Sequence, residues 1–172
     1  RFRLVLILAM LLAGWSRGEA HASSGSGVLI TEFLASNQTG LRDGDGDRAD
    51  WLELTNFAST VVDLTGWYLS DDPNDLVKWR LGRETLAPGE RLVVFASGKD
   101  RNAAEAGEWH TNFRISRDAG GYLALIHADG VTVASLYSAY PEQTADLSYG
   151  LTEGELSYFL VPTPGAPNRE PV

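Results

Sequence analysis

Residues 86–96 read LAPGERLVVFA, and this stretch decides the fold class. Residues 87–90 form a turn signal, because proline presets φ and glycine accepts a positive φ. Residues 91–96 are almost wholly apolar and carry β-branched and aromatic side chains, which is typical of a central strand. The rest of the chain repeats this unit of a turn followed by a short apolar strand.

Similar short runs recur on both sides of this stretch, with turn residues between them. Residues 51–55 (WLELT) alternate in polarity, and residues 128–130 (ADG) form a hairpin turn. No long run of helical period interrupts them; one helical turn is expected over residues 101–107. The pattern predicts an all-β sandwich or barrel. Its expected strands are residues 28–35, 51–55, 61–64, 67–70, 78–81, 91–96, 122–127, 131–136 and 157–160.

The composition excludes several classes of protein. The 172 residues include no cysteine, which rules out a disulfide scaffold, a cysteine nucleophile, a thiolate zinc site and an iron–sulfur cluster in this chain. Three histidines leave little material for a histidine-based metal site. The formal net charge of −9 argues against a nucleic-acid partner bound through a basic surface.

The first 22 residues have the order of a secretory signal peptide. Arg1 and Arg3 precede an apolar run over residues 4–13, and the small-residue pattern Ala20-His21-Ala22 follows. The run is shorter than the roughly 20 apolar residues that span a bilayer. We therefore expect cleavage after Ala22 and export to the periplasm, cell surface or medium, with no transmembrane segment left; the alternative is an uncleaved anchor.

Composition also sets the expected domain limits. Residues 23–27 (SSGSG) are expected to be a flexible linker, and residues 28–161 a single β-sandwich. Residues 162–168 (PTPGAPN) hold three prolines, so residues 162–172 are expected to be a C-terminal linker. A linker in this place suggests a fragment of a longer protein or a short relative of one.

An ordered set of short phrases runs through the chain: residues 30–33 (ITEF), 35–37 (ASN), 50–54 (DWLEL) with Asn56, 64–71 (LTGWYLSD), 78–79 (KW), 86–90 (LAPGE), 110–113 (HTNF) and 129–130 (DG). Through these phrases the chain resembles, across residues 28 to 150, the lamin tail domain family, in the version found in exported bacterial proteins. It implies an immunoglobulin-like β-sandwich that is not itself an enzyme and that docks to other molecules. The expected partner is a protein or polysaccharide whose identity the sequence does not give.

Residues 43–50 (DGDGDRAD) form the sharpest local feature. Alternating aspartates with glycine between them can curl around calcium, which takes six to eight oxygen ligands. The stretch is not an EF-hand, because Arg48 and Leu54 stand where that loop needs glycine and glutamate. The candidate calcium ligands are Asp43, Asp45, Asp47, Asp50 and Glu53. The alternative is a solvated acidic turn held by aspartates that bond their own backbone.

Other candidates are weaker. Residues 71–75 (DDPND) could add oxygen ligands but favour a turn. His110 lacks a visible nucleophile and orienting group, so it is expected to be structural. Trp51, Trp67 and Trp79 lie in strand patterns, and at least two of them should be core. Trp109 lies in a loop-like stretch and is the best candidate for an exposed binding aromatic.

Three functions follow from these features. The first is a non-catalytic interaction module of an exported protein, which calcium stabilises if it binds residues 43–50, hereafter the acidic loop. The second is a carbohydrate-binding module that uses Trp109 and other exposed aromatics. The third is a hydrolase that uses the acidic loops and a divalent metal.

Overall fold

A computed structural model describes residues 20–22, 27–101 and 107–172, the first three as backbone. Every regular element in this part of the chain is a β-strand, which confirms the expected all-β class. Over the same residues no helix is long and apolar enough to cross a membrane. The expected leader and the linker at 23–27 lie outside the described residues, apart from 20–22 and Gly27, and so does most of the helical turn expected at 101–107.

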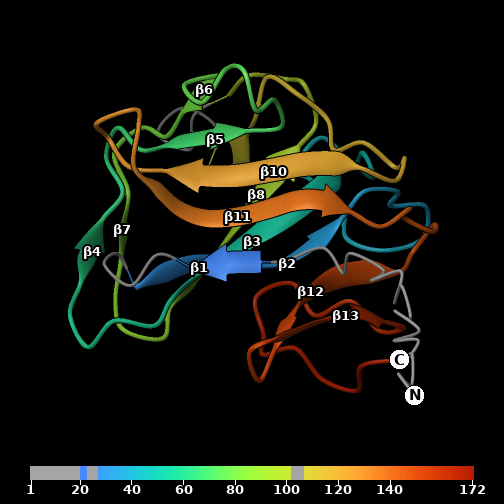
Figure 1. The fold of residues 1–172 in the computed structure, drawn as a ribbon. Coiled ribbons are helices and arrows are strands. Elements are labelled where there is room, and N and C mark those ends of the chain that lie inside the picture. Colours follow the sequence, from blue (N-terminus) through green and yellow to red (C-terminus); the bar gives the residue numbers. More distant parts are fainter. Residues whose placement is uncertain (1–19, 23–26, 102–106) are drawn as a thin grey trace, which may run out of the picture.

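Two main sheets pack against each other, and the strand order of the first is β1-β11-β10-β5-β6 (Figure 1). All its neighbours are antiparallel. Its strands are β1 (Ala20–Ala22), β11 (Val133–Tyr140), β10 (Gly121–Ile126), β5 (Tyr68–Ser70) and β6 (Trp79–Arg80). The three residues before the expected cleavage position therefore lie at the edge of this sheet.

The second main sheet has the order β13-β12-β2-β3-β8-β9, and only its β8–β9 pair is parallel. Its strands are β13 (Glu155–Phe159), β12 (Ser148–Thr152), β2 (Val28–Leu34), β3 (Asp50–Asn56), β8 (Arg91–Ala96) and β9 (Trp109–His110). A small third sheet pairs β4 (Val62–Asp63) with β7 (Thr85–Leu86). The expected strands at 28–35, 51–55 and 91–96 correspond to β2, β3 and β8.

The main core lies between the two sheets, because the strands present one apolar face to each other. On β2 and β3 the inward residues include Ile30, Phe33, Leu52 and Leu54, all buried. Phe33 is surrounded by tyrosines, with ring centroids 5.0–5.9 Å away. This packing of aromatic and aliphatic side chains supplies the main stabilising free energy of the fold.

Two hydrogen bonds tie the sheets together at Ile30. The Tyr137 hydroxyl donates to the Ile30 carbonyl at 2.9 Å, and the Ile30 N–H donates to Ser135 Oγ at 3.1 Å. Ser135 and Tyr137 both belong to β11. The bonds fix β11 against β2, in addition to the apolar packing between the sheets.

The strand boundaries differ from the expected ones around the last hairpins. The turn expected at residues 128–130 extends to residue 132, because Asp129 Oδ1 accepts the N–H groups of Val131 and Thr132. Consequently β11 begins at Val133 and runs to Tyr140. The sequence pattern also missed β12, which Glu153 and Gly154 connect to β13.

The outer face of the six-stranded sheet is only partly open to water. Leu34, Trp51 and Phe95 form a second, smaller apolar cluster there. Leu41 from the β2–β3 connection and Pro162 and Pro164 from the C-terminal segment lie beside Leu34 and Trp51 on this face, so both segments cover part of it. Residues 162–172, expected to be a linker, thus lie against the sheet: Asn168 Nδ2 donates to the carbonyls of Thr31 and Leu151.

Replacing Phe33 should show which packing holds the fold. Phe33 is fully buried, whereas Phe57 is 60% exposed, so the same change at the two positions separates burial from chemistry. We expect Phe33→Ala to lower the free energy of unfolding by about 3–5 kcal/mol. Phe57→Ala should change it by less than about 0.5 kcal/mol. Urea unfolding of both variants measures this, and equal losses would contradict the assigned core.

Candidate functional site

The acidic loop between β2 and β3 is held in shape by its own backbone and by Asp43. Asp43 Oδ1 accepts the N–H groups of Asp45 and Asp47, at 3.1 and 2.9 Å. The Gly46 N–H donates to the Asp43 carbonyl, and Gly46 has a φ of 87°, which favours glycine. This local bonding brings Asp43, Asp45 and Asp47 together, with one oxygen of each within 4.8 Å of the others.

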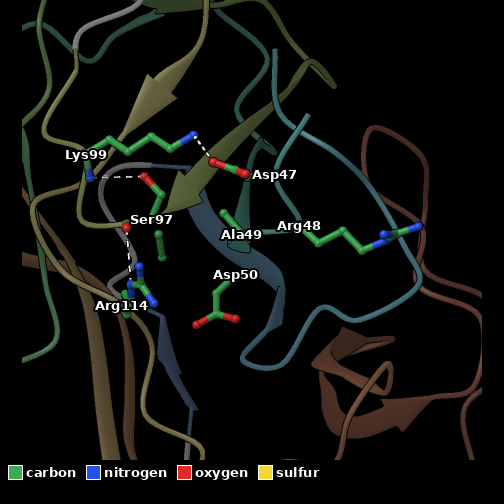
Figure 2. A pocket seen from close by; sticks show the side chains of 8 residues that line it. Asp47, Arg48, Ala49, Asp50, Ser97, Lys99 and Arg114 are labelled. Carbon is green, nitrogen blue, oxygen red and sulfur yellow. Dashed lines mark hydrogen bonds and ion pairs between the residues drawn. The ribbon is translucent and has the colours of Figure 1, made fainter. Parts of the chain in front are cut away.

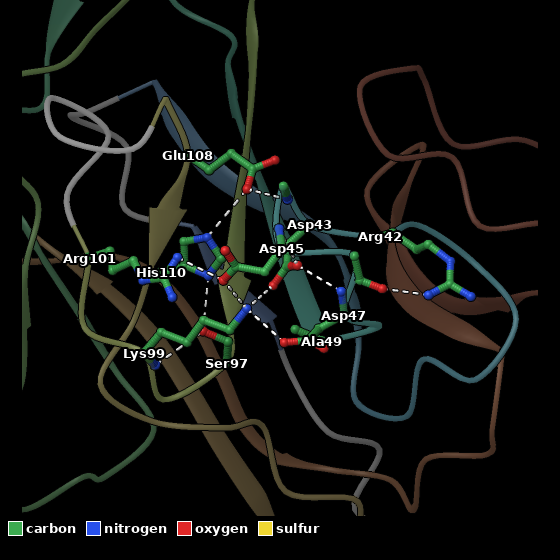
Figure 3. A network of polar contacts seen from close by, with 12 residues as sticks. Arg42, Asp43, Asp45, Asp47, Ala49, Ser97, Lys99, Arg101, Glu108 and His110 are labelled. Atoms are coloured by element: carbon green, nitrogen blue, oxygen red, sulfur yellow. Dashed lines mark hydrogen bonds and ion pairs between the residues drawn. The ribbon is translucent and has the colours of Figure 1, made fainter.

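A lysine ammonium lies among these three carboxylates (Figure 3). Lys99 Nζ is 2.5 Å from Asp43 Oδ2, 2.7 Å from Asp45 Oδ2 and 3.0 Å from Asp47 Oδ2. Arg101 Nη1 adds a second cation, 2.7 Å from Asp45 Oδ2. Lys99 and Arg101 follow β8, so this contact joins the acidic loop to the far end of a neighbouring strand. The protein itself thus supplies cationic partners to all three aspartates.

The charges in this cluster stabilise one another. Burial lowers the pKa of the Lys99 ammonium, but its hydrogen bonds with the three aspartates outweigh burial, and the net pKa is raised. Burial raises the pKa of Asp43, yet the bonds from Lys99 and from the loop N–H groups bring the net pKa below its usual value. The Lys99 hydrogen bond is the main cause that lowers the pKa of Asp45. The shifted pKa values keep Asp43, Asp45 and Lys99 ionised at neutral pH.

The other two candidate calcium ligands lie elsewhere. Asp50, the first residue of β3, accepts the backbone N–H groups of Asn37 and Ile115. Glu53 is fully buried on the outer face of the six-stranded sheet, where Thr31 donates to it at 2.7 Å and the Gly165 N–H at 2.7 Å. The structure therefore groups three of the five predicted ligands and separates Asp50 and Glu53 from them.

Glu53 has a second buried carboxylate as its neighbour across the β2–β3 pair. Glu32 Oε1 accepts the hydroxyl of Ser148 at 2.5 Å, and both Glu32 oxygens accept the N–H of Thr163. Burial is the main cause that raises the pKa of both glutamates. The two carboxylates anchor the C-terminal segment, because Thr163 and Gly165 supply N–H donors that these buried oxygens need.

His110 lies in a chain of polar contacts that the sequence did not predict. Its Nδ1 is 3.0 Å from Ser97 Oγ, and its Nε2 is 3.4 Å from Glu108 Oε2 (Figure 3). Serine, histidine and carboxylate in this order are the groups of a nucleophilic triad. His110 is only 1% exposed and Ser97 6%, and Ser97 Oγ also accepts the N–H of Lys99. Because Ser97 and His110 are buried, we interpret these contacts as structural. They connect β9 to the acidic loop, since Glu108 also accepts the Gly44 N–H.

The prediction that Trp109 is exposed is wrong. β9 pairs in parallel with β8, and this pairing places Trp109 in the core with 3% exposure. Its ring packs edge-to-face on Trp79, with centroids 6.2 Å apart, and its indole N–H donates to Glu84. Trp51, Trp67 and Trp79 are also buried, as expected for at least two of them.

The second acidic stretch, at residues 71–75, forms a turn. Asp72 Oδ1 accepts the Asn74 N–H at 2.8 Å, and the Ser70 hydroxyl donates to the Asp75 carbonyl. Lys78 pairs with Asp71 at 2.6 Å. These contacts are the ones a capped turn requires.

A polar pocket of about 350 Å³ lies beside the acidic loop (Figure 2). The loop, the start of β3 and the segments that follow β8 and β9 all contribute to it, and its charged lining residues are Asp47, Arg48, Asp50, Lys99 and Arg114. Burial raises the pKa of Asp50 to about 6, although nearby Arg114 and Arg117 lower it. The pocket thus contains one carboxyl group that titrates near neutral pH.

Residues 21–150 match the family model described as Lamin Tail Domain. The chain belongs to the lamin tail domain family. A search of curated proteins gave no match. Lamin tail domains are immunoglobulin-like, so the expected immunoglobulin-like β-sandwich is confirmed for this chain. The family is also non-catalytic, in agreement with the burial of Ser97 and His110.

The residues that sequence analysis missed in this lamin tail domain are the cationic partners. Lys99 is separated from Asp43 by 56 positions, and no motif links the two. Ser97 was missed for the same reason, since the β8–β9 pairing brings it to His110. The spacing of the aspartates identified the loop, but it did not indicate that the Lys99 ammonium lies among their carboxylates.

The raised pKa of Asp50 gives a prediction with a defined sign. A carboxyl whose folded pKa lies above its ordinary 3.8 destabilises the fold while charged, and this cost falls as pH drops through about 6. We expect Asp50→Asn to be more stable than the native chain at pH 7.5, by up to about 3 kcal/mol, with the difference closing near pH 4. The exposed Asp118→Asn is the control and should change stability little at either pH. Urea unfolding at the two pH values measures this, and a gap that widened on acidification would contradict the assigned burial.

Proposed function

We propose that this lamin tail domain is a non-catalytic interaction module of an exported protein and binds a macromolecular partner at the cell surface. One observation carries the proposal: the chemically reactive groups of the described residues are used inside the fold. Lys99 pairs with the three aspartates of the acidic loop, Ser97 and His110 are buried, and Glu32 and Glu53 hold the C-terminal segment. This use of the reactive groups among the described residues favours binding over turnover as the function.

The outer face of the six-stranded sheet offers apolar surface for such binding. A pocket of about 220 Å³ has Leu34 and Trp51 among its lining residues, with Leu41 on the acidic-loop side and Leu160 on the C-terminal side. Leu160 is 62% exposed and Leu41 36%. Exposed leucines beside a partly filled apolar pocket are a common feature of protein-binding surfaces.

The two alternative functions have less support. A carbohydrate-binding module needs exposed aromatic rings, and burial removes Trp109, the residue on which that alternative depended. A metal-dependent hydrolase needs an open coordination position near a bound substrate. The three grouped aspartates instead bind Lys99.

We also propose that the acidic loop binds calcium. Three carboxylates fall short of the six to eight oxygens that calcium takes, and Lys99 Nζ occupies the place between them. Calcium would have to displace this ammonium, so we propose that it stabilises the native chain only where it competes successfully with Lys99.

Thermal melts of the native chain and of Lys99→Met test this competition. The substitution leaves three carboxylates facing one another without the ammonium, so in EDTA we expect Tm to fall by about 2–6 °C. Millimolar calcium should then raise the Tm of Lys99→Met more than that of the native chain, because a ligand stabilises the state that binds it. Lys78→Met, which removes a half-buried ion pair with Asp71 and a cation–π contact with Phe113, is the matched control; we expect it to lower Tm without increasing the response to calcium. A variant unaffected by calcium would contradict a cation site at this loop.

Capture by the folded full chain tests the interaction module. We expect the immobilised chain to retain a macromolecule from surface extracts of the producing cells in a saturable manner, and to lose it when unfolded by heat. Protease treatment of the extract should abolish retention if the partner is a protein, and polysaccharide degradation should abolish it if the partner is a glycan. Absence of saturable retention, or measurable turnover of an ester or phosphate substrate, would contradict the proposed function.

A further inference from the structure

The free edges of the two main sheets differ in how they are protected. A strand edge presents unpaired N–H and C=O groups, and proteins commonly shorten, charge or cover such edges to prevent unwanted pairing. β6 and β9 have two residues each. β13 is covered, because Phe159 forms a bridge with Pro171 and the Val172 N–H donates to the Tyr158 carbonyl at 3.0 Å. The edges formed by β6 and β9 are therefore short, and the edge formed by β13 is covered.

The β11 edge is protected differently, because among the described residues only β1 covers it. β11 (VASLYSAY) has eight residues, the most of any strand described, and holds neither a charge nor a proline. Its described pairing partner on the outer side is β1, over Ser135, Leu136 and Tyr137 (Figure 1). Ala139, with a φ of 53°, and two irregularities in the β10 pairing limit the regular part of β11 to about these central residues.

The segment that occupies this edge shows that it accepts an added strand. β1 pairs antiparallel, with Ala20 opposite Tyr137, His21 opposite Leu136 and Ala22 opposite Ser135. The two register positions opposite Tyr137 and Ser135 both carry alanine. Tyr137 and Ser135 are the residues fixed to Ile30 across the core, so β11 is rigid where the pairing occurs.

The sequence predicts that cleavage after Ala22 removes this occupant. The described residues of the two hydrophobic clusters lie at or after Val28, in the part of the chain that remains after cleavage. In the cleaved chain the backbone groups of Ser135–Tyr137 would lose their strand partner while remaining fixed in an extended conformation. A preformed, unpaired edge is what strand addition by a partner peptide requires.

We propose that the β11 edge is a strand-acceptor site for an extended segment of a partner protein with small, uncharged residues at alternate positions. The segment binds antiparallel along Ser135–Tyr137, in the register that β1 occupies in the full chain. This inference rests on the proposed interaction function and names the surface and the partner chemistry for it. The acceptor is short, so the affinity comes mainly from main-chain hydrogen bonds and the specificity from the alternating small residues.

A synthetic peptide of residues 18–24 (GEAHASS) is the probe, because it carries the register of β1. It is added to the native full chain and to the full-chain double variant Ala20→Pro/His21→Pro. One of these two adjacent amides faces β11, so the prolines remove β1 from the edge whichever one it is. We expect at least about tenfold tighter binding to the variant, which corresponds to about 1.4 kcal/mol of competition by β1. The matched control, Ser23→Pro/Ser24→Pro, lies outside β1 and should bind like the native chain.

Two modified peptides test the pairing itself. One is N-methylated at His21 and the other at Ala20 and Ala22; adjacent amides point to opposite sides of a strand, so only one of the two peptides should lose binding. The chain has no cysteine, which allows disulfide trapping. A peptide with cysteine in place of Glu19 should cross-link to Ser138→Cys, the next position of the antiparallel register, and not to Ser157→Cys on β13.

Equal affinity for the native chain and the proline variant, absence of binding to both, or equal effects of the two N-methylated peptides would overturn the inference. Its failure can be told apart from failure of the proposed function. If the captured surface partner remains bound in saturating peptide, the interaction function holds and the β11 edge is not its site. If the peptide binds as expected but no surface macromolecule is captured, the edge accepts strands and the proposed function fails.

Discussion

The central strands β2 and β3 are buried on both faces, and the rest of the structure depends on this constraint. Their inward residues, such as Phe33 and Leu52, pack in the main core between the sheets. Their outward residues include Leu34 and Trp51, which are equally buried. A strand pair that cannot face water on either side needs a second cover, and two irregular segments provide it: the acidic loop and the C-terminal segment.

The same constraint explains why two carboxylates help to hold a proline-rich tail. Glu32 and Glu53 are neighbours on the outer face, and their burial would be costly without hydrogen-bond donors. The tail supplies main-chain N–H groups from Thr163 and Gly165, the residues that separate its prolines. Composition alone indicates a linker, because prolines cannot join a central strand. It cannot show that the residues between prolines meet buried acceptors about 110–130 positions away.

Strand positions were predicted best where the pattern of apolar and polar side chains within a short segment determines them. Residues 91–96 and 51–55 show a buried or alternating pattern, and both lie in strands at the centre of a sheet. Prediction failed where a residue's environment depends on distant pairing. Trp109 looks loop-like in sequence, yet a two-residue parallel pairing with β8 buries it. Lys99 was missed because its partners are in the acidic loop, and no spacing rule connects the end of β8 to that loop.

Covering both faces of β2 and β3 also shapes what the molecule can do. The acidic loop stays against the sheet through Lys99, Arg101 and the Glu108 contact to Gly44, so its charges serve the fold. The buried Ser97 and His110 belong to the same network. Because these ionic groups are used within the fold, recognition of a partner would depend on side chains and main-chain groups at the periphery. Recognition through main-chain edges depends little on particular side chains, so the strand-acceptor site proposed for this sandwich would not be revealed by a sequence motif.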